Sequence, residues 1–181
     1  MPQPVATPAA PPLAATAERV PPPPIPACRE WAAAYDGAQG PLLDLTQAVP
    51  GYAPHPELLA RLGAAAADPS FAGYGPLEGE SGLREAFAEE TRLLHGGDVA
   101  ADDVRITAGA NQGFNLAMTA ITAPGDAVIL PTPWFFNHQM ALTLRGVEGI
   151  PLPCRAEDGF LPDPDCAAAL ITPHTRAIVL V

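Results

Sequence analysis

Short apolar runs alternate with longer amphipathic segments from residue 103 to residue 181. Runs rich in Val, Ile and Leu cover residues 103–107, 126–131, 147–152 and 176–181, and each predicts a buried strand. The segments between them, residues 111–121, 134–146 and 164–171, predict helices. Strands alternating with helices are typical of an α/β fold with three layers, in which helices cover both faces of a mostly parallel sheet.

The region before residue 103 has a different pattern, with helices and glycine-rich loops. Residues 27–36 predict a short helix ended by Gly37, residues 42–47 an extended piece, and residues 56–67 a second helix. Residues 71–80 contain too much glycine for regular structure and predict a loop. The next helix, capped by Ser81, continues until Gly96 and Gly97.

The first 26 residues lack any such pattern, since ten of them are proline. Proline donates no backbone hydrogen bond, so residues 1–26 predict a disordered or polyproline-like tail. An alternative is that this tail is a ligand for a proline-recognition domain.

Charge and cysteine usage exclude several classes of function. The net charge is −11 and the nine arginines are scattered, which argues against a nucleic-acid partner. The four histidines are far apart in sequence, so we expect no metal site, and the three cysteines lack the CxxC spacing of a disulfide or zinc framework. We find no signal peptide and no membrane span, so we expect a cytoplasmic protein.

Two strand-to-helix junctions carry candidate chemistry, because ligands of parallel sheets bind at the carboxyl ends of the strands. The first is residues 107–113, TAGANQG, where Gly109 allows a tight turn and the following amides open a helix suited to bind a phosphate. An ordinary turn with Asn111 as the helix cap is the alternative. The dinucleotide and Walker glycine patterns are both absent.

The second junction is residues 131–138, PTPWFFNH, where three aromatic residues follow a predicted strand. Phe135 and Phe136 are expected to pack in the core. Trp134 is expected at the mouth of the sheet, where its ring would lie flat against a planar ligand.

These motifs together resemble the class I and II aminotransferases of fold type I. YGPLEGESGLREAFAEE at residues 74–90 resembles the family's Tyr-Gly loop and Leu-Arg-Glu helix. Residues 107–135 resemble its phosphate-binding helix, its Pro-Gly-Asp turn and its cofactor-stacking aromatic residue. The resemblance covers residues 42–181. It implies that residues 101–181 are the first part of the large domain that binds pyridoxal 5'-phosphate (PLP), with the sheet incomplete at residue 181, and that residues 27–100 form an N-terminal arm with helices of the small-domain and interface region.

The resemblance also implies individual roles. The residues assigned to the PLP phosphate or ring are Gly109, Ala110, Asn111, Trp134 and Tyr74, of which Tyr74 would reach the phosphate of the partner subunit in a homodimer. Gly51 and Tyr52 would contact the substrate, an amino acid or a 2-oxo acid. For Tyr74, a loop aromatic residue covering the edge of the core is the alternative.

The catalytic lysine of the family, whose amine joins the PLP aldehyde and moves the substrate proton, has no counterpart, because the chain contains no lysine. We therefore expect an N-terminal piece of a longer protein that is inactive and poorly soluble alone. A lyase, a decarboxylase or a cyclopropane-forming synthase of the same fold would share these residues. A cofactor-binding protein without turnover and an interaction module built on the proline-rich tail are further alternatives.

Overall fold

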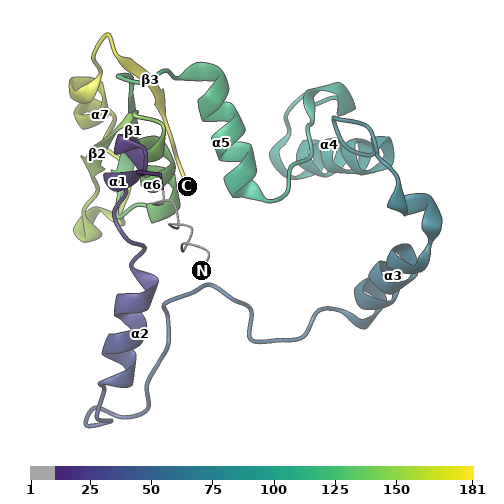
Figure 1. The fold of residues 1–181 in the computed structure, drawn as a ribbon, viewed down its shortest axis with the longest axis horizontal. Coiled ribbons are helices and arrows are strands. Elements are labelled where there is room, and N and C mark those ends of the chain that lie inside the picture. Colours follow the sequence, from purple (N-terminus) through teal and green to yellow (C-terminus); the bar gives the residue numbers. More distant parts are fainter. Residues whose placement is uncertain (1–10) are drawn as a thin grey trace, which may run out of the picture. The chain divides into compact units, whose positions relative to one another are not determined.

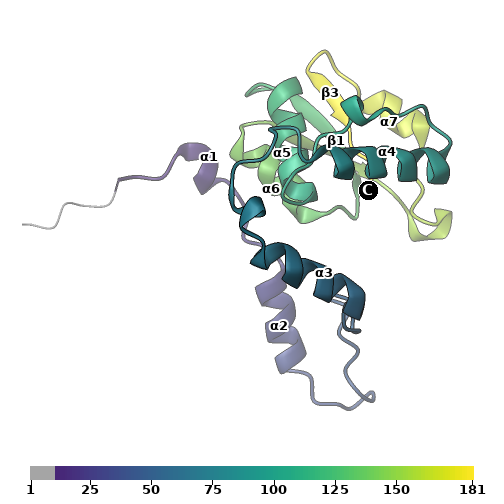
Figure 2. The ribbon, with the colours of Figure 1, turned by 90° about the vertical axis from the view of Figure 1, so that its right-hand side faces the viewer.

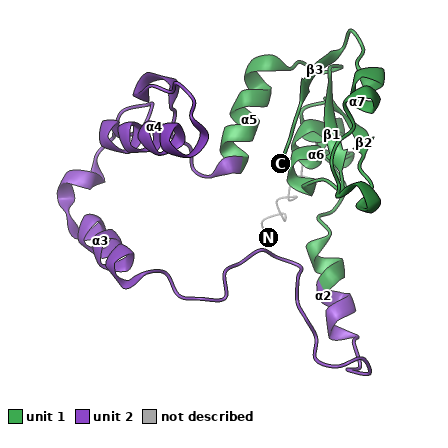
Figure 3. Ribbon diagram, turned by 180° about the vertical axis from the view of Figure 1, so that it is seen from behind, with its two compact units in different colours: residues 1–28, 111–181 green, residues 29–110 purple. Residues whose placement is uncertain are grey.

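The computed structural model describes residues 11–181, which separate into two compact units. The first unit contains the described residues up to Cys28 together with Asn111–Val181, and the second contains Arg29–Ala110 (Figure 3). The first ten residues of the predicted disordered tail lie outside the described residues. Each unit is described by itself below.

A parallel sheet of three strands is the centre of the first unit (Figure 1). The strands are β1 (Ala127–Thr132), β2 (Glu148–Pro153) and β3 (Thr175–Ile178), in the order β2-β1-β3. Their register aligns Ile129 with Ile150 and with Ile178. The prediction of an α/β fold with a parallel sheet is confirmed.

Helices pack on both faces of this sheet, on one side α5 (Ala110–Ile121) and α6 (Phe136–Leu144) and on the other α7 (Pro164–Leu170) (Figure 2). The core on the α5 and α6 side contains Met118, Val128, Leu130, Leu142 and Val147. Ile129 and Leu152 are also fully buried, which accounts for the continuous apolar runs of the sequence.

A buried carboxylate fixes the start of β1 relative to β3. Asp126 accepts a hydrogen bond from the Ala123 N–H at 2.8 Å and pairs with Arg176 at 3.1 Å. The Ala123 hydrogen bond, and then Arg176, hold the pKa of Asp126 below its ordinary value. The Pro-Gly-Asp turn therefore joins two neighbouring strands at their amino ends.

The N-terminal segment contains two helices, α1 (Ala15–Glu18) and α2 (Ile25–Ala33). The prediction of a disordered tail over residues 1–26 is therefore wrong for residues 15–18 and 25–26, which are helical, and residues 15–18 contact α6. Helix α2 begins at Ile25, two positions before the predicted start, because proline is compatible with the first turn of a helix.

The second unit contains α3 (Pro56–Ala67), the 3₁₀ turn η1 (Pro69–Ala72), α4 (Ser81–His95) and the 3₁₀ turn η2 (Ala101–Asp103). Helix α3 has its predicted bounds, and α4 ends at Gly96, whose φ of 68° is left-handed. Ser81 does not cap α4, because it is the first helical residue and Glu80 precedes the helix without a capping hydrogen bond.

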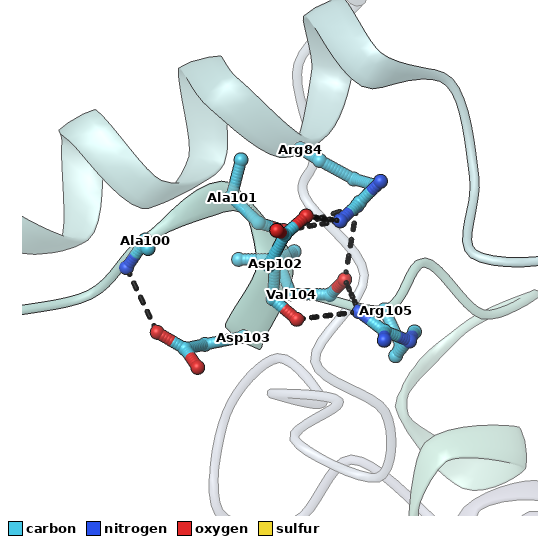
Figure 4. Close-up of polar contacts among 7 residues, drawn as sticks. All are labelled: Arg84, Ala100, Ala101, Asp102, Asp103, Val104 and Arg105. Atoms are coloured by element: carbon cyan, nitrogen blue, oxygen red, sulfur yellow. Dashed lines mark hydrogen bonds and ion pairs between the residues drawn. The ribbon is translucent and has the colours of Figure 1, made fainter.

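The predicted strand at residues 103–107 is absent from the structure, and Arg84 explains why (Figure 4). Its guanidinium donates hydrogen bonds to the carbonyls of Ala101 and Val104, at 2.8 to 3.2 Å, and pairs with Asp102 at 2.8 Å. The Ile106 N–H donates to the Glu78 carbonyl at 3.0 Å. A side chain and a loop thus occupy backbone groups that a neighbouring strand would otherwise pair.

Candidate functional site at the carboxyl ends of the strands

A cavity of about 370 Å³ opens at the carboxyl ends of the three strands. Its walls are formed by Leu130–Phe135 at the end of β1, by Cys154, Phe160 and Pro162 after β2, and by Val179–Val181 after β3. All of these residues belong to the first unit. Ligands of open parallel sheets bind at this edge, so the cavity is the candidate functional site.

Trp134 lies in the wall of this cavity, in the loop between β1 and α6. The residue is 36% exposed, which leaves part of it available to a ligand. Phe135 also lines the cavity, which differs from the expectation that it packs in the core, because it immediately precedes α6 rather than lying inside the helix.

The backbone before α5 turns sharply at Gly109. Its φ is 86°, a left-handed value, and a Cβ there would meet no atom within 4 Å, so the backbone conformation rather than crowding favours glycine. The Gly109 N–H already donates to the Thr107 carbonyl at 2.8 Å. Among the residues that the structure describes, the N–H groups of Ala110 and Asn111 have no hydrogen-bond partner. These two amides at the helix start are the ones available to an anion.

Asn111 is not the cap of α5, since the helix begins one residue earlier, at Ala110. Its carbonyl accepts a hydrogen bond from the Asn115 side chain at 2.9 Å. The alternative in which Asn111 caps the helix is therefore wrong, because Asn111 is the second residue of α5 and lies within its first turn.

A pair of stacked rings connects α5 to α6 inside the first unit. The rings of Phe114 and His138 are parallel to within 23°, with centroids 4.0 Å apart, and Phe135 packs edge-on against His138. Burial lowers the pKa of His138 from its ordinary value of 6.5. Within the first unit, α5 and the loop that carries Trp134 are thus connected through aromatic contacts.

Tyr74, Gly51 and Tyr52 lie in loops of the second unit. All three are exposed, and a Cβ on Gly51 would meet no atom within 4 Å. The roles of these three residues stay predictions.

Several cavity residues were not singled out from the sequence. Cys154 and Val179–Val181 follow strands, so the rule that ligands bind at carboxyl ends would have found them. Phe160 is a less visible case, since it comes from the loop after η3 (Ala156–Asp158), and its φ of 58° is unusual for a residue other than glycine.

Two other kinds of site find no support among the described residues. Residues 11–181 contain no group of three or more His, Cys, Asp or Glu side chains that could hold a metal ion. In the same part of the chain, no helix is both long and apolar enough to cross a membrane.

Comparison with known proteins identifies the family of this chain. The family model described as aminotransferase class I and II matches residues 35–181. The chain belongs to the class I and II aminotransferase family. An aspartate aminotransferase of Pyrococcus horikoshii is 36% identical over 115 residues, covering 64% of this chain and 29% of that protein. A valine–pyruvate aminotransferase of Mycobacterium tuberculosis is 32% identical over 152 residues, covering 83% of this chain and 39% of that protein.

Solved aminotransferase structures share the fold. The aspartate aminotransferase of Rhizobium meliloti superimposes with a TM-score of 0.78 at 27% identity, over 94% of this chain and 42% of that one. The aspartate aminotransferase of Thermus thermophilus, solved with maleate, superimposes with a TM-score of 0.77 at 28% identity, and the superposition covers 44% of that enzyme's chain. This aminotransferase-family chain therefore spans less than half the length of these relatives, and its α/β unit corresponds to part of the large domain of PLP-dependent aminotransferases.

Proposed function

We propose that this chain provides the phosphate-binding and ring-binding residues of a PLP-dependent aminotransferase that moves an amino group between an amino acid and a 2-oxo acid. The observation that carries the proposal is the cavity at the carboxyl ends of β1, β2 and β3, with Trp134 in its wall. Family membership supports the reaction class.

The residues of the cavity fit the aromatic ring of PLP. The wall is largely apolar: Trp134 is partly exposed, and Pro131, Pro133 and Val179 line the same cavity. A flat aromatic ligand buries apolar area against such a wall and stacks on the indole. Bound PLP supplies a conjugated ring that accepts electron density from the substrate carbon.

The start of α5 fits the phosphate of PLP. The Ala110 and Asn111 amides are open to an anion at the positive end of the helix dipole. In our proposal they bind the phosphate together with Gly109, whose N–H would exchange its bond to Thr107 for one to the ligand.

The remaining roles belong to the second unit and to chemistry that this chain does not contain. We propose that Tyr74 reaches the phosphate of the partner subunit in a homodimer and that Gly51 and Tyr52 contact the substrate. No side chain here offers a primary amine, since lysine is absent. The groups of this chain therefore bind and orient, and an amine from outside these 181 residues would transfer the proton.

A PLP titration tests the proposal directly. In a Trp31→Phe background, the emission of Trp134 should fall saturably as PLP is added, and inorganic phosphate should compete. Trp134→Leu should weaken PLP binding about 3- to 10-fold, while Trp134→Phe, which keeps a ring, should retain most of the affinity. Affinity equal in the Leu variant and the parent would count against the stacking role.

A borohydride experiment then separates binding from covalent attachment. With PLP bound, reduction should trap no adduct on a side chain, because no lysine is present.

The competition with inorganic phosphate tests the α5 amides. If phosphate does not displace bound PLP, the assignment of these amides to the PLP phosphate is contradicted.

A further inference from the structure

The segment around α1 packs against the first unit with one side only. Thr16, Ala17 and Val20 are half-buried, whereas Ala15 on the same helical turn is exposed. The Thr16 methyl carbon lies 3.7 Å from the position that a Cβ on Gly146 would take, after the end of α6. The buried side of α1 therefore rests on α6 and on the turn that follows it.

Helix α1 cannot owe its structure to its own sequence. It has four residues, far below the length at which an isolated helix persists in water, and Ala14 provides no side-chain cap. Prolines flank it at residues 11–12 and 21–24, and they restrict the unfolded chain, so ordering this segment loses less entropy. Contact with the first unit is thus what holds the turn.

Arg19, which follows α1, lines a second cavity at the opposite edge of the sheet from the candidate site. This cavity, of about 410 Å³, lies at the amino ends of the strands and is lined by Asp126 and Glu148 and by Gln139 and Thr143 of α6. Of the two carboxylates in this wall, Asp126 already pairs with Arg176 at 3.1 Å. Glu148 is therefore the carboxylate that attracts the Arg19 guanidinium, in a chain with a net charge of −11.

We propose that residues 14–20 form a clasp, a segment that opens and closes over the amino-end cavity. In the closed form Thr16 packs against the turn at Gly146 and Arg19 covers the cavity. The clasp opens readily, because one side of a four-residue helix buries little surface, and the exposed position of Arg19 leaves its charge largely screened. The occupant of this surface is thus the chain's own N-terminal segment. The proposal does not depend on PLP binding.

Trypsin cleavage after Arg19 tests the clasp, since cutting the Arg19–Val20 bond requires the open form. Thr16→Asp places a charge in the contact, while Ala15→Asp places the same charge on the exposed side of the same turn. We expect Thr16→Asp to speed cleavage about fivefold and Ala15→Asp to change it less than about twofold, because only the first alters the open population. Cleavage after Arg61, in α3 of the second unit, should be unchanged in both.

A comparison that needs no variant completes the test. The Arg19–Val20 bond in the 181-residue chain should be cut at least about fivefold more slowly than in a peptide of residues 11–28, where no clasp can form. Equal rates in chain and peptide would overturn the proposal, as would equal acceleration by the two Asp variants. Amide exchange of Val128–Leu130 should be the same in both variants, and loss of that protection in Thr16→Asp alone would make α1 a structural part of the core instead of a clasp.

Discussion

The two units of this chain bury very different amounts of their apolar side chains. In the first unit, Val128, Ile129, Leu130, Leu142 and Leu152 are fully buried between a sheet and its helices. In the second unit, the buried apolar residues among those described are Ala88 and Val104. Large side chains such as Leu59 and Phe87 remain exposed there. Burial of apolar area is the main source of folding free energy, so the first unit should be much the more stable of the two.

Polar contacts take a larger share in holding the second unit together. Arg84 is the main example, with a side chain only 14% exposed and three hydrogen-bond acceptors on the segment 101–104. The same chain therefore contains one unit that is stabilised mainly by an apolar core and one that is stabilised by the capping of backbone groups and by a buried arginine. Four predictions test this contrast between the units.

The largest effect is expected in the core of the first unit. Leu142→Ala removes a fully buried side chain from α6 and should destabilise that unit by about 3 kcal/mol, within the range for such cavities. Urea unfolding followed by Trp134 emission in a Trp31→Phe background measures the stability of the first unit, and helical circular dichroism, to which α3 contributes, measures the control. Leu59→Ala, in α3 of the second unit, is the control because Leu59 is 51% exposed, and it should change stability by less than about 1 kcal/mol. Equal losses in the two variants would contradict the contrast between the units.

Arg84→Ala should produce the next largest effect, and it should be confined to the second unit. It leaves the carbonyls of Ala101 and Val104 without their charged donor, which should cost about 2 kcal/mol. Faster amide exchange over residues 100–106, with no change in β1, is the expected signature. Arg61→Ala is the matched control, since its exposed pair with Glu57 should contribute less than about 0.5 kcal/mol.

Two glycine substitutions in the second unit should have opposite signs. Gly96 ends α4 with a left-handed φ of 68°, so Gly96→Ala should destabilise by about 1 kcal/mol through backbone strain. Gly63 lies inside α3, where a Cβ meets nothing, so Gly63→Ala should stabilise by about 0.5 to 1 kcal/mol. Thermal unfolding followed by helical circular dichroism compares the pair. A shift of the same sign in both would show that backbone conformation does not control these positions.

The contrast between the units also explains which parts of the fold were predictable. Strands β1, β2 and β3 could be predicted because buried parallel strands need continuous Val, Ile and Leu. The end of α4 could be predicted because Gly96 supplies its left-handed cap. The run at residues 103–107 has the same composition but is no strand, since Arg84 and Glu78 take its hydrogen bonds. Apolar composition reports burial, whereas strand pairing depends on distant residues.

The candidate site was predictable to a similar degree. Trp134 and the turn at Gly109 follow predicted strands or open predicted helices, so local patterns located them. Cys154 and Phe160 join the cavity only through the packing of β2 and its following loop against β1, which local patterns do not report. The docking of α1 was invisible for the same reason, because composition indicated disorder while contact with α6 orders it.

The smallest effect is expected from the titration of His138, and it should be confined to the first unit. Burial against Phe114 lowers the pKa of this imidazole, so the unfolded chain binds its proton more readily than the folded chain. The stability of the first unit is therefore complete above the ordinary pKa of 6.5 and declines as the pH falls from there through the lowered pKa of the folded state.

His138→Phe keeps a ring stacked on Phe114 but cannot be protonated, so the part of the acid-induced loss of stability that comes from this site should disappear. Urea unfolding of parent and variant at several pH values, followed by Trp134 emission in a Trp31→Phe background, measures the difference. Parallel stability curves for the two proteins below the ordinary pKa would show that the stacked imidazole contributes nothing to the pH response of this unit.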